Sequence, residues 1–88
     1  AYDDLEEPIR EVTESRFGLQ CGVYTDSTER ALYLARNLRT GGVIINGTST
    51  WRTDQLAYGG VKDSGLGREG PRYAIRDMTE ERLVLFNL

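Results

Sequence analysis

The residues best suited to chemistry lie on a long segment, residues 46–70, which ends in a glycine-rich stretch. Arg52 could pair with a substrate anion, because a guanidinium presents several hydrogen-bond donors in one plane. Trp51 and Tyr58 could line an apolar pocket beside it. The alternative is that Arg52 is solvated and that the aromatic side chains form a lid over the core. Spacing alone leaves both interpretations open.

The sequence contains few residues that could act as a catalytic nucleophile or a metal ligand. The sequence has no histidine and a single cysteine, Cys21. This excludes a Ser-His-Asp triad, a Cys-His pair and most zinc sites within the chain, and it excludes an intrachain disulfide. Cys21 lies in an alternating apolar segment, so we expect it to pack in the core as a small hydrophobic residue. We therefore expect no catalytic residue and no metal ligand here.

Gly65, Gly67 and Gly70 have the spacing of a dinucleotide fingerprint, G-x-G-x-x-G. That motif should directly follow a strand and open a helix, with an acidic residue about 20 positions on after a second strand. The nearest expected strand ends near Ile45, and no second strand is expected before Glu80. We therefore do not expect these glycines to form a dinucleotide site.

The totals limit the class of protein. Eighty-eight residues allow one small domain, and 39% apolar residues with a mean hydropathy of -0.49 predict a marginal core or one completed by a partner. A net charge of -3, mixed along the chain, argues against nucleic-acid binding. No apolar run is long enough for a membrane span and no signal-peptide pattern appears, so a cytoplasmic location is expected.

Apolar periodicity and turn residues predict an α/β fold with a βαβ unit, a long glycine-rich loop, a short helix and a terminal strand. The first helix is expected from Asp3 or Asp4 to about Arg16, with Gly18 ending it. The second is expected from Asp26 to the glycines at 41 and 42, and the third over residues 71–78. Strands are expected over residues 19–25, 43–45 and 82–88. The strand at 43–45 should be buried on both faces. Two parallel strands do not make a stable sheet, so another segment or chain should cover them.

Together these segments resemble the C-terminal end of the NAD(P)-dependent aldehyde dehydrogenase superfamily. The resemblance covers essentially the whole chain, in family order, through residues 17–25, 31–46, 58–70 and 79–86. It implies a partial aldehyde dehydrogenase catalytic domain over residues 1–78 and an oligomerisation strand over residues 79–88. It also implies a homo-oligomer that pairs through residues 82–88.

The resemblance implies oxidation of an aldehyde to an acid with NAD or NADP, by a cysteine thiolate, a hydride transfer and a glutamate-activated water. The family's catalytic cysteine, glutamate and main cofactor-binding residues lie upstream, so the chain alone should be inactive and bind no cofactor. Thr50, Arg52 and Tyr58 fall on substrate-pocket positions. Tyr58 replaces the usual phenylalanine and Ala57 the usual proline. Arg52 replaces an apolar or aromatic residue, which suggests an aldehyde with an anionic tail.

Two other interpretations remain open at this point. The chain could be a free-standing, non-catalytic α/β interaction or assembly domain derived from such an enzyme, which would bury its own strand edges. It could also be an autonomous nucleotide binder, although the context of the glycine motif disfavours that. Our first expectation is the C-terminal segment of a cytoplasmic aldehyde dehydrogenase.

Overall fold

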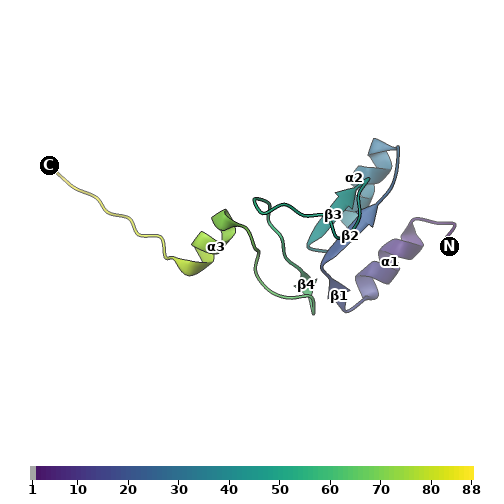
Figure 1. Ribbon diagram of the computed structural model, residues 1–88, viewed down its shortest axis with the longest axis horizontal. Helices are drawn as coiled ribbons and strands as arrows, with labels where there is room; N and C mark the ends of the chain where they lie inside the picture. Colours follow the sequence, from purple (N-terminus) through teal and green to yellow (C-terminus); the bar gives the residue numbers. More distant parts are fainter. Residues whose placement is uncertain (1) are drawn as a thin grey trace.

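The computed structural model describes residues 2–88 and contains two small sheets and three helices in that range. In chain order the elements are α1 (Glu6–Glu14), β1 (Phe17–Gly18), β2 (Gln20–Val23), α2 (Thr28–Asn37), β3 (Gly42–Ile45), β4 (Val61–Lys62) and α3 (Pro71–Met78). β2 pairs with β3 in parallel, and β1 pairs with β4 antiparallel. Figure 1 shows these elements up to β4 gathered together, with α3 and the C-terminal residues reaching away from them.

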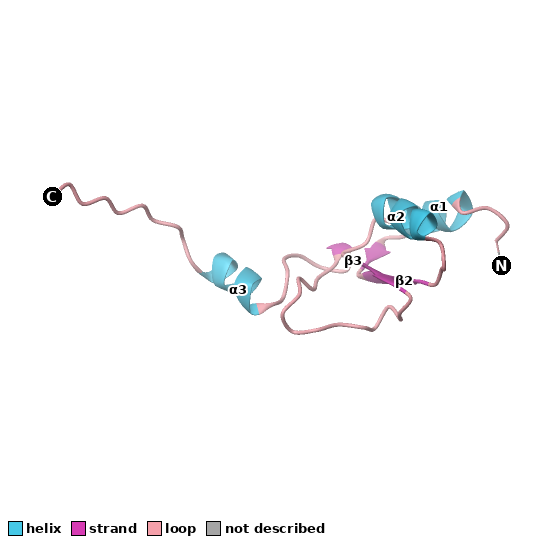
Figure 2. Cartoon of the chain, turned by 90° about the horizontal axis from the view of Figure 1, so that it is seen from above, coloured by secondary structure: helices cyan, strands magenta, loops and turns pink. Residues whose placement is uncertain are grey.

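The predicted βαβ unit is confirmed as β2, α2 and β3. Cys21 lies opposite Val43 in the parallel pair. α1 and α2 lie side by side on one side of this sheet (Figure 2). The core forms there: Ile9 of α1, Leu34 of α2 and Leu38, the C-cap of α2, are buried. Half-buried apolar residues of α1, of its N-cap and of both strands pack around them. A βαβ crossover packs its helix onto the sheet in this way.

The other side of the β2–β3 sheet is covered by the loop that follows β3. Gly22 makes this close approach possible, because a Cβ there would lie 2.6 Å from the carbonyl oxygen of Gly47. The Gln20 amide Nε2 donates to the carbonyl oxygen of Ser49 at 3.0 Å and also to that of Trp51. The predicted burial of residues 43–45 on both faces is only partly met, since Ile45 is 39% exposed.

The first helix is shorter than predicted, and Gly18 does not end it. α1 begins after Leu5 and ends at Glu14, and the Asp4 carboxylate accepts a hydrogen bond from the amide of Glu6. Gly18 belongs to β1, where a Cβ would lie 2.8 Å from a methyl carbon of Val61. The glycine is needed for close contact between segments and not for a left-handed helix stop.

The predicted strand over residues 19–25 is wrong at both ends. Its ordered part is β2, and Leu19 lies between two strands that pair with different partners. The second helix also differs, because its N-cap is Ser27 and not Asp26: the Ser27 hydroxyl accepts a hydrogen bond from the amide of Arg30 at 3.3 Å. It ends at Asn37, before the glycines that were expected to stop it.

The predicted terminal strand is absent from this structure, whereas the helix predicted over residues 71–78 is confirmed as α3. Residues 79–88 contain no strand, and their apolar side chains are exposed, from 63% for Val84 to 117% for Leu88. A strand requires a hydrogen-bonding neighbour, and none of the described residues pairs with this segment. Within residues 2–88, no helix has the length and apolar character required to span a membrane.

Candidate functional site

The candidate site is a small pocket of about 100 Å³ between the β2–β3 sheet and the loop that covers it. Its lining combines residues of both strands with aromatic, apolar and polar residues of the loop: Gln20, Gly42, Val43, Ile44, Trp51, Arg52, Thr53, Leu56, Ala57 and Tyr58. Ligand pockets commonly combine an apolar wall with a few polar groups in this way. The pocket therefore offers apolar contact with one cationic group among its lining residues.

Arg52 is held at this pocket by two contacts. Its guanidinium carbon lies 4.2 Å from the centre of the Tyr58 ring, a cation–π arrangement. Its Nη2 donates to Oε2 of Glu69 at 3.1 Å, and the two side chains are 41% and 67% exposed. Arginine has five N–H donors, so this geometry leaves further donors available to a second anion.

Backbone hydrogen bonds bring Tyr58 and Glu69 together. The Tyr58 amide donates to the Glu69 carbonyl at 3.2 Å, and the Glu69 amide donates to the Tyr58 carbonyl at 2.6 Å. Gly70 follows with φ 117°, where an L side chain is strained, and a Cβ there would lie 3.0 Å from the carbonyl oxygen of Leu56. The start of α3 is thereby fixed against the loop.

The side chains of Arg68 and Glu69 contact the loop that precedes them. The Arg68 Nη1 donates to the carbonyl oxygens of Gly60 at 3.0 Å and Gly67 at 2.7 Å. Glu69 contacts Arg52. These contacts close the glycine-rich segment on itself.

The structure brings together two of the three residues predicted to bind substrate. Arg52 and Tyr58 line the pocket and touch one another, whereas Thr50 is outside the lining and its hydroxyl lies 2.8 Å from that of Thr48. Trp51, which the sequence suggested as an apolar wall, also lines it. A role of Thr50, Arg52 and Tyr58 in binding a substrate stays a prediction.

Two residues at the site were missed from the sequence. Gln20 holds the loop through its side-chain amide, and Glu69 pairs with Arg52. A polar residue at the start of an otherwise apolar strand was a usable signal for Gln20. Glu69 gave no comparable signal, because its partner lies 17 positions earlier in an irregular segment.

Cys21 does not have the environment of a nucleophile. It is half-buried and packs against the core of Ile9, Leu34 and Leu38. Burial raises the pKa of its thiol above the ordinary value, which keeps the sulfur protonated at neutral pH. Within residues 2–88, no group of three or more metal-ligating side chains is close enough together to hold an ion.

The glycine motif does not have the setting of a dinucleotide site. The strand before it, β4, has two residues, is antiparallel to β1 and ends three residues before Gly65. The Gly67 carbonyl is occupied by Arg68, and Gly70 packs against Leu56 and Tyr73. A dinucleotide fingerprint requires a parallel strand that turns directly into a helix. These residues therefore do not fit a nicotinamide dinucleotide.

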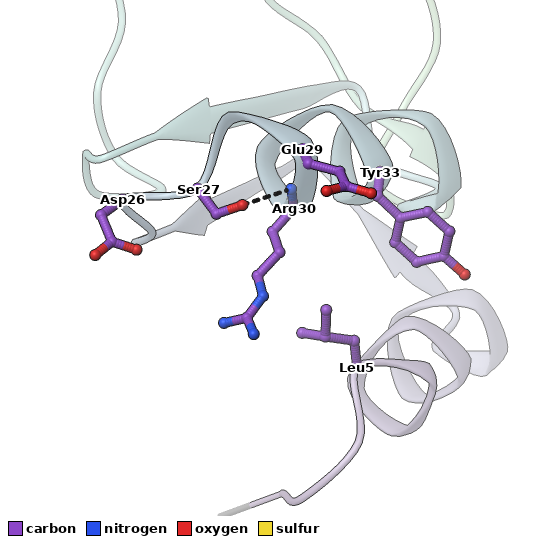
Figure 3. Close-up of a pocket in the computed structure, with 6 residues that line it drawn as sticks. All are labelled: Leu5, Asp26, Ser27, Glu29, Arg30 and Tyr33. Carbon is purple, nitrogen blue, oxygen red and sulfur yellow. Dashed lines mark hydrogen bonds between the residues drawn. The ribbon is translucent and has the colours of Figure 1, made fainter.

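A larger hollow of about 590 Å³ lies between the starts of α1 and α2 (Figure 3). Arg30 and Tyr33 extend from α2 on the side where Leu5 lies. Two of its polar groups serve the fold: the Ser27 hydroxyl caps α2, and the Tyr33 hydroxyl donates to the Glu6 carboxylate. That bond raises the pKa of the Tyr33 phenol above its ordinary value. We assign this hollow to the junction of two helices.

The family profile and the related sequences that match this chain all point to one protein family. Residues 1–84 match the sequence profile of the aldehyde dehydrogenase family. The chain is 48% identical over 87 residues to a 3-sulfolactaldehyde dehydrogenase of Priestia megaterium, which covers 99% of this chain and 18% of that protein. It is 45% identical to a lactaldehyde dehydrogenase of Methanococcus aeolicus, over 97% of this chain and 18% of that protein. The chain thus spans about one fifth of the length of these relatives.

Solved structures agree with the sequence match. Aldehyde dehydrogenase 21 from Physcomitrella patens, in complex with the reaction product succinate, superposes with a TM-score of 0.85 at 42% identity, over 90% of this chain and 16% of that chain. Glyceraldehyde-3-phosphate dehydrogenase from Methanocaldococcus jannaschii, in complex with NADP, gives 0.81 at 42% identity, over 86% and 17%. The small α/β arrangement therefore matches part of a larger enzyme structure.

Proposed function

This chain belongs to the aldehyde dehydrogenase family, and from that premise we propose that it is the C-terminal segment of an enzyme that oxidises an aldehyde with an anionic tail. In such an enzyme, residues 1–78 complete the catalytic domain. The pocket beside β3 then forms one wall of the substrate site. Arg52 binds the anionic tail, Tyr58 and Trp51 form the apolar surround, and Thr50 contacts the substrate from outside the pocket lining.

The observation that carries this proposal is the position of the Arg52 guanidinium. It lies over the Tyr58 ring at 4.2 Å, at the edge of an apolar pocket, with one of its donors used by Glu69. Carboxylate, phosphate and sulfonate groups each present two or more oxygens that match the planar donors of arginine. A stacked guanidinium is also held in one orientation before the anion arrives.

The related enzymes support an anionic tail, with one useful exception. The Priestia relative acts on 3-sulfolactaldehyde, which carries a sulfonate, and the Physcomitrella enzyme was solved with succinate, which carries two carboxylates. The Methanococcus relative acts on lactaldehyde, which has no charge. The two aldehydes share a three-carbon skeleton and differ by the sulfonate on the third carbon, so they make a matched pair of test substrates.

The reaction itself would need groups that these 88 residues do not supply. Oxidation of an aldehyde to an acid consumes water and passes a hydride to NAD or NADP. The relative from Methanocaldococcus was solved with NADP, while the glycine motif of this chain does not fit a dinucleotide. We propose that the isolated chain is inactive and that its own residues bind, orient and shield the tail of the substrate.

The exposed C-terminal arm supports a second part of the proposal, a homo-oligomer. Residues 82–88 carry Leu83, Val84, Leu85 and Phe86, all at least 63% exposed and extended away from the rest of the chain (Figure 1). An exposed apolar segment with free backbone groups is a template for pairing with another chain. We propose that this arm forms its strand against a neighbouring subunit.

The experiment that tests the proposed function is an Arg52→Ala variant of the complete enzyme, assayed with 3-sulfolactaldehyde and lactaldehyde. Loss of a charge-assisted contact should raise KM for 3-sulfolactaldehyde about tenfold or more and change KM for lactaldehyde less than about twofold. Arg72→Ala, which removes an exposed arginine from α3, is the matched control. An unchanged KM for 3-sulfolactaldehyde in Arg52→Ala would contradict the proposal.

A further inference from the structure

We propose that Gln20 is a positioning residue for the anionic-tail site, because its side-chain amide fixes the peptide group from which Arg52 extends. This inference rests on the proposed function. The Gln20 Nε2 donates to the carbonyl oxygen of Ser49 at 3.0 Å and also to that of Trp51. The Trp51 carbonyl belongs to the peptide unit that joins Trp51 to Arg52. This unit is planar and includes both flanking Cα atoms, so a bond that holds its oxygen also orients the Cα of Arg52.

The amide of Gln20 attaches the loop to the sheet. A glutamine amide has two N–H donors, and the two carbonyl oxygens provide one acceptor for each. Within residues 2–88, the backbone of loop residues 47–57 makes no hydrogen bond to a strand, and its own bond joins the Trp51 amide to the Thr48 carbonyl at 3.1 Å. The two bonds from Gln20 therefore tie this part of the loop to β2.

Gly42 gives the Gln20 side chain its path to the loop. The two residues lie opposite one another in the parallel pair of β2 and β3. A Cβ on Gly42 would lie 2.9 Å from Oε1 and 3.2 Å from Cγ of Gln20. The glutamine side chain therefore passes over β3 at a position that has no side chain, and it reaches the loop that follows this strand. Strand register and loop position are thus coupled through one amide.

This arrangement is internal to the segment, because the donor and both acceptors lie within residues 20–51. The backbone of the segment superposes on the much larger Physcomitrella enzyme with a TM-score of 0.85 over 90% of this chain. Arg52 is held at both ends, by Gln20 at its backbone and by the Tyr58 ring 4.2 Å from its guanidinium carbon. A guanidinium that is placed before the substrate arrives loses less conformational entropy on binding. Gln20 therefore strengthens binding of the anionic tail through Arg52.

A Gln20→Met variant of the complete enzyme removes both donors and keeps the length of the side chain. We expect KM for 3-sulfolactaldehyde to rise about fivefold, with little change in kcat and less than about a twofold change in KM for lactaldehyde. A residue that only stabilised the fold would lower Tm and the amount of active enzyme and leave KM unchanged. Gln55→Met, the same change in the loop at a residue outside the pocket lining, is the matched control.

The double variant Gln20→Met with Arg52→Ala shows whether Gln20 acts through Arg52. If it does, Gln20→Met causes no further rise in KM for 3-sulfolactaldehyde in the Arg52→Ala background. An equal rise in both backgrounds overturns the inference. Gln20→Asn keeps the amide but shortens its reach by one carbon, so it should raise KM in the same direction and serves as the test if Gln20→Met does not fold.

The inference about Gln20 and the proposed function fail in different ways. An unchanged KM for 3-sulfolactaldehyde in the Gln20 variants, together with a raised KM in Arg52→Ala, overturns the inference alone. An unchanged KM in Arg52→Ala overturns the proposed function, and the inference falls with it.

Discussion

The residues before and after Ile45 are held in place by different forces. Residues 6–45 contain every buried apolar side chain of the described chain, Ile9, Leu34 and Leu38. Residues 46–88 contain none, and their order comes from hydrogen bonds to backbone carbonyls and from glycines at close approaches. The first region is a scaffold with its own core, whereas the second carries the candidate site and depends on being covered. The predictions below test that division, from the largest expected effect to the smallest.

The largest effect is expected where the two regions touch. A Cβ on Gly41, just before β3, would lie 1.7 Å from the carbonyl oxygen of Gly59. Gly41→Ala should therefore force the loop away from the scaffold and cost about 3 kcal/mol or more, measured as a lower Tm of the complete protein. Gly67→Ala is the control: its Cβ meets only Asp77 at 3.6 Å, so its cost is the positive φ alone, about 1 kcal/mol. Equal losses would contradict the assigned contact.

Substitution of a leucine by alanine should affect stability in the first region and assembly in the second. Leu34 is 8% exposed and Leu85 is 73% exposed. Leu34→Ala should lower the free energy of unfolding by about 2–4 kcal/mol, because it leaves a cavity in the core. Leu85→Ala should leave the Tm of the subunit nearly unchanged and weaken self-association, which sedimentation measures. Unaltered self-association of the Leu85→Ala protein would contradict the proposed pairing of residues 82–88 with a neighbouring subunit.

Lys62 connects the two regions through hydrogen bonds from its ammonium group and not through apolar burial. Lys62 Nζ donates to the carbonyl oxygens of Val12 at 2.7 Å, Thr13 at 3.1 Å and Ser15 at 2.9 Å. It therefore satisfies carbonyl groups at the end of α1, which has no basic residue in its last turn. Lys62→Met should cost about 1 kcal/mol. Lys62→Arg, which keeps the charge, should recover part of the loss, and no recovery would indicate that backbone shape matters instead.

The smallest effect is expected at the contact of α1 with α2, and it depends on pH. The Tyr33 hydroxyl donates to Glu6, which raises the phenol pKa. Its contribution is complete below the ordinary tyrosine pKa of about 10 and is lost as pH rises through the folded value. Tyr33→Phe should therefore lower Tm slightly at pH 8, and the difference from the unaltered protein should vanish above the folded pKa. A difference that grows with pH would contradict this sign.

Local sequence signals predicted the helices and the βαβ unit better than they predicted the short and terminal strands. Pro71 after Gly70 placed the start of α3, and apolar runs placed the βαβ unit. β1 and β4 were missed because two residues are too short for a periodic pattern and pair across 43 positions, as Gly18 does with Val61. The terminal strand was wrongly predicted because a strand needs a pairing partner, and residues 2–88 provide none in this structure. Helix propensity is local, whereas strand pairing and ion pairs are not.

At the candidate site, too, residue types were predictable from the sequence and contacts between distant residues were not. Residue type alone indicated Arg52 and Tyr58, since a guanidinium beside aromatic groups suits an anion. Their contact with Glu69 depends on how the loop returns on itself, which no local pattern encodes. Thr50 was assigned by family resemblance, and its hydroxyl lies against Thr48 and outside the pocket.

The central claim is that the Arg52 pocket selects an aldehyde by its anionic tail. The most direct measurement is kcat/KM of the unaltered complete enzyme for 3-sulfolactaldehyde and for lactaldehyde at the same pH and ionic strength. The account predicts a preference of about tenfold or more for the sulfonate, the value of one charge-assisted contact. Equal values, or a preference for lactaldehyde, would contradict it.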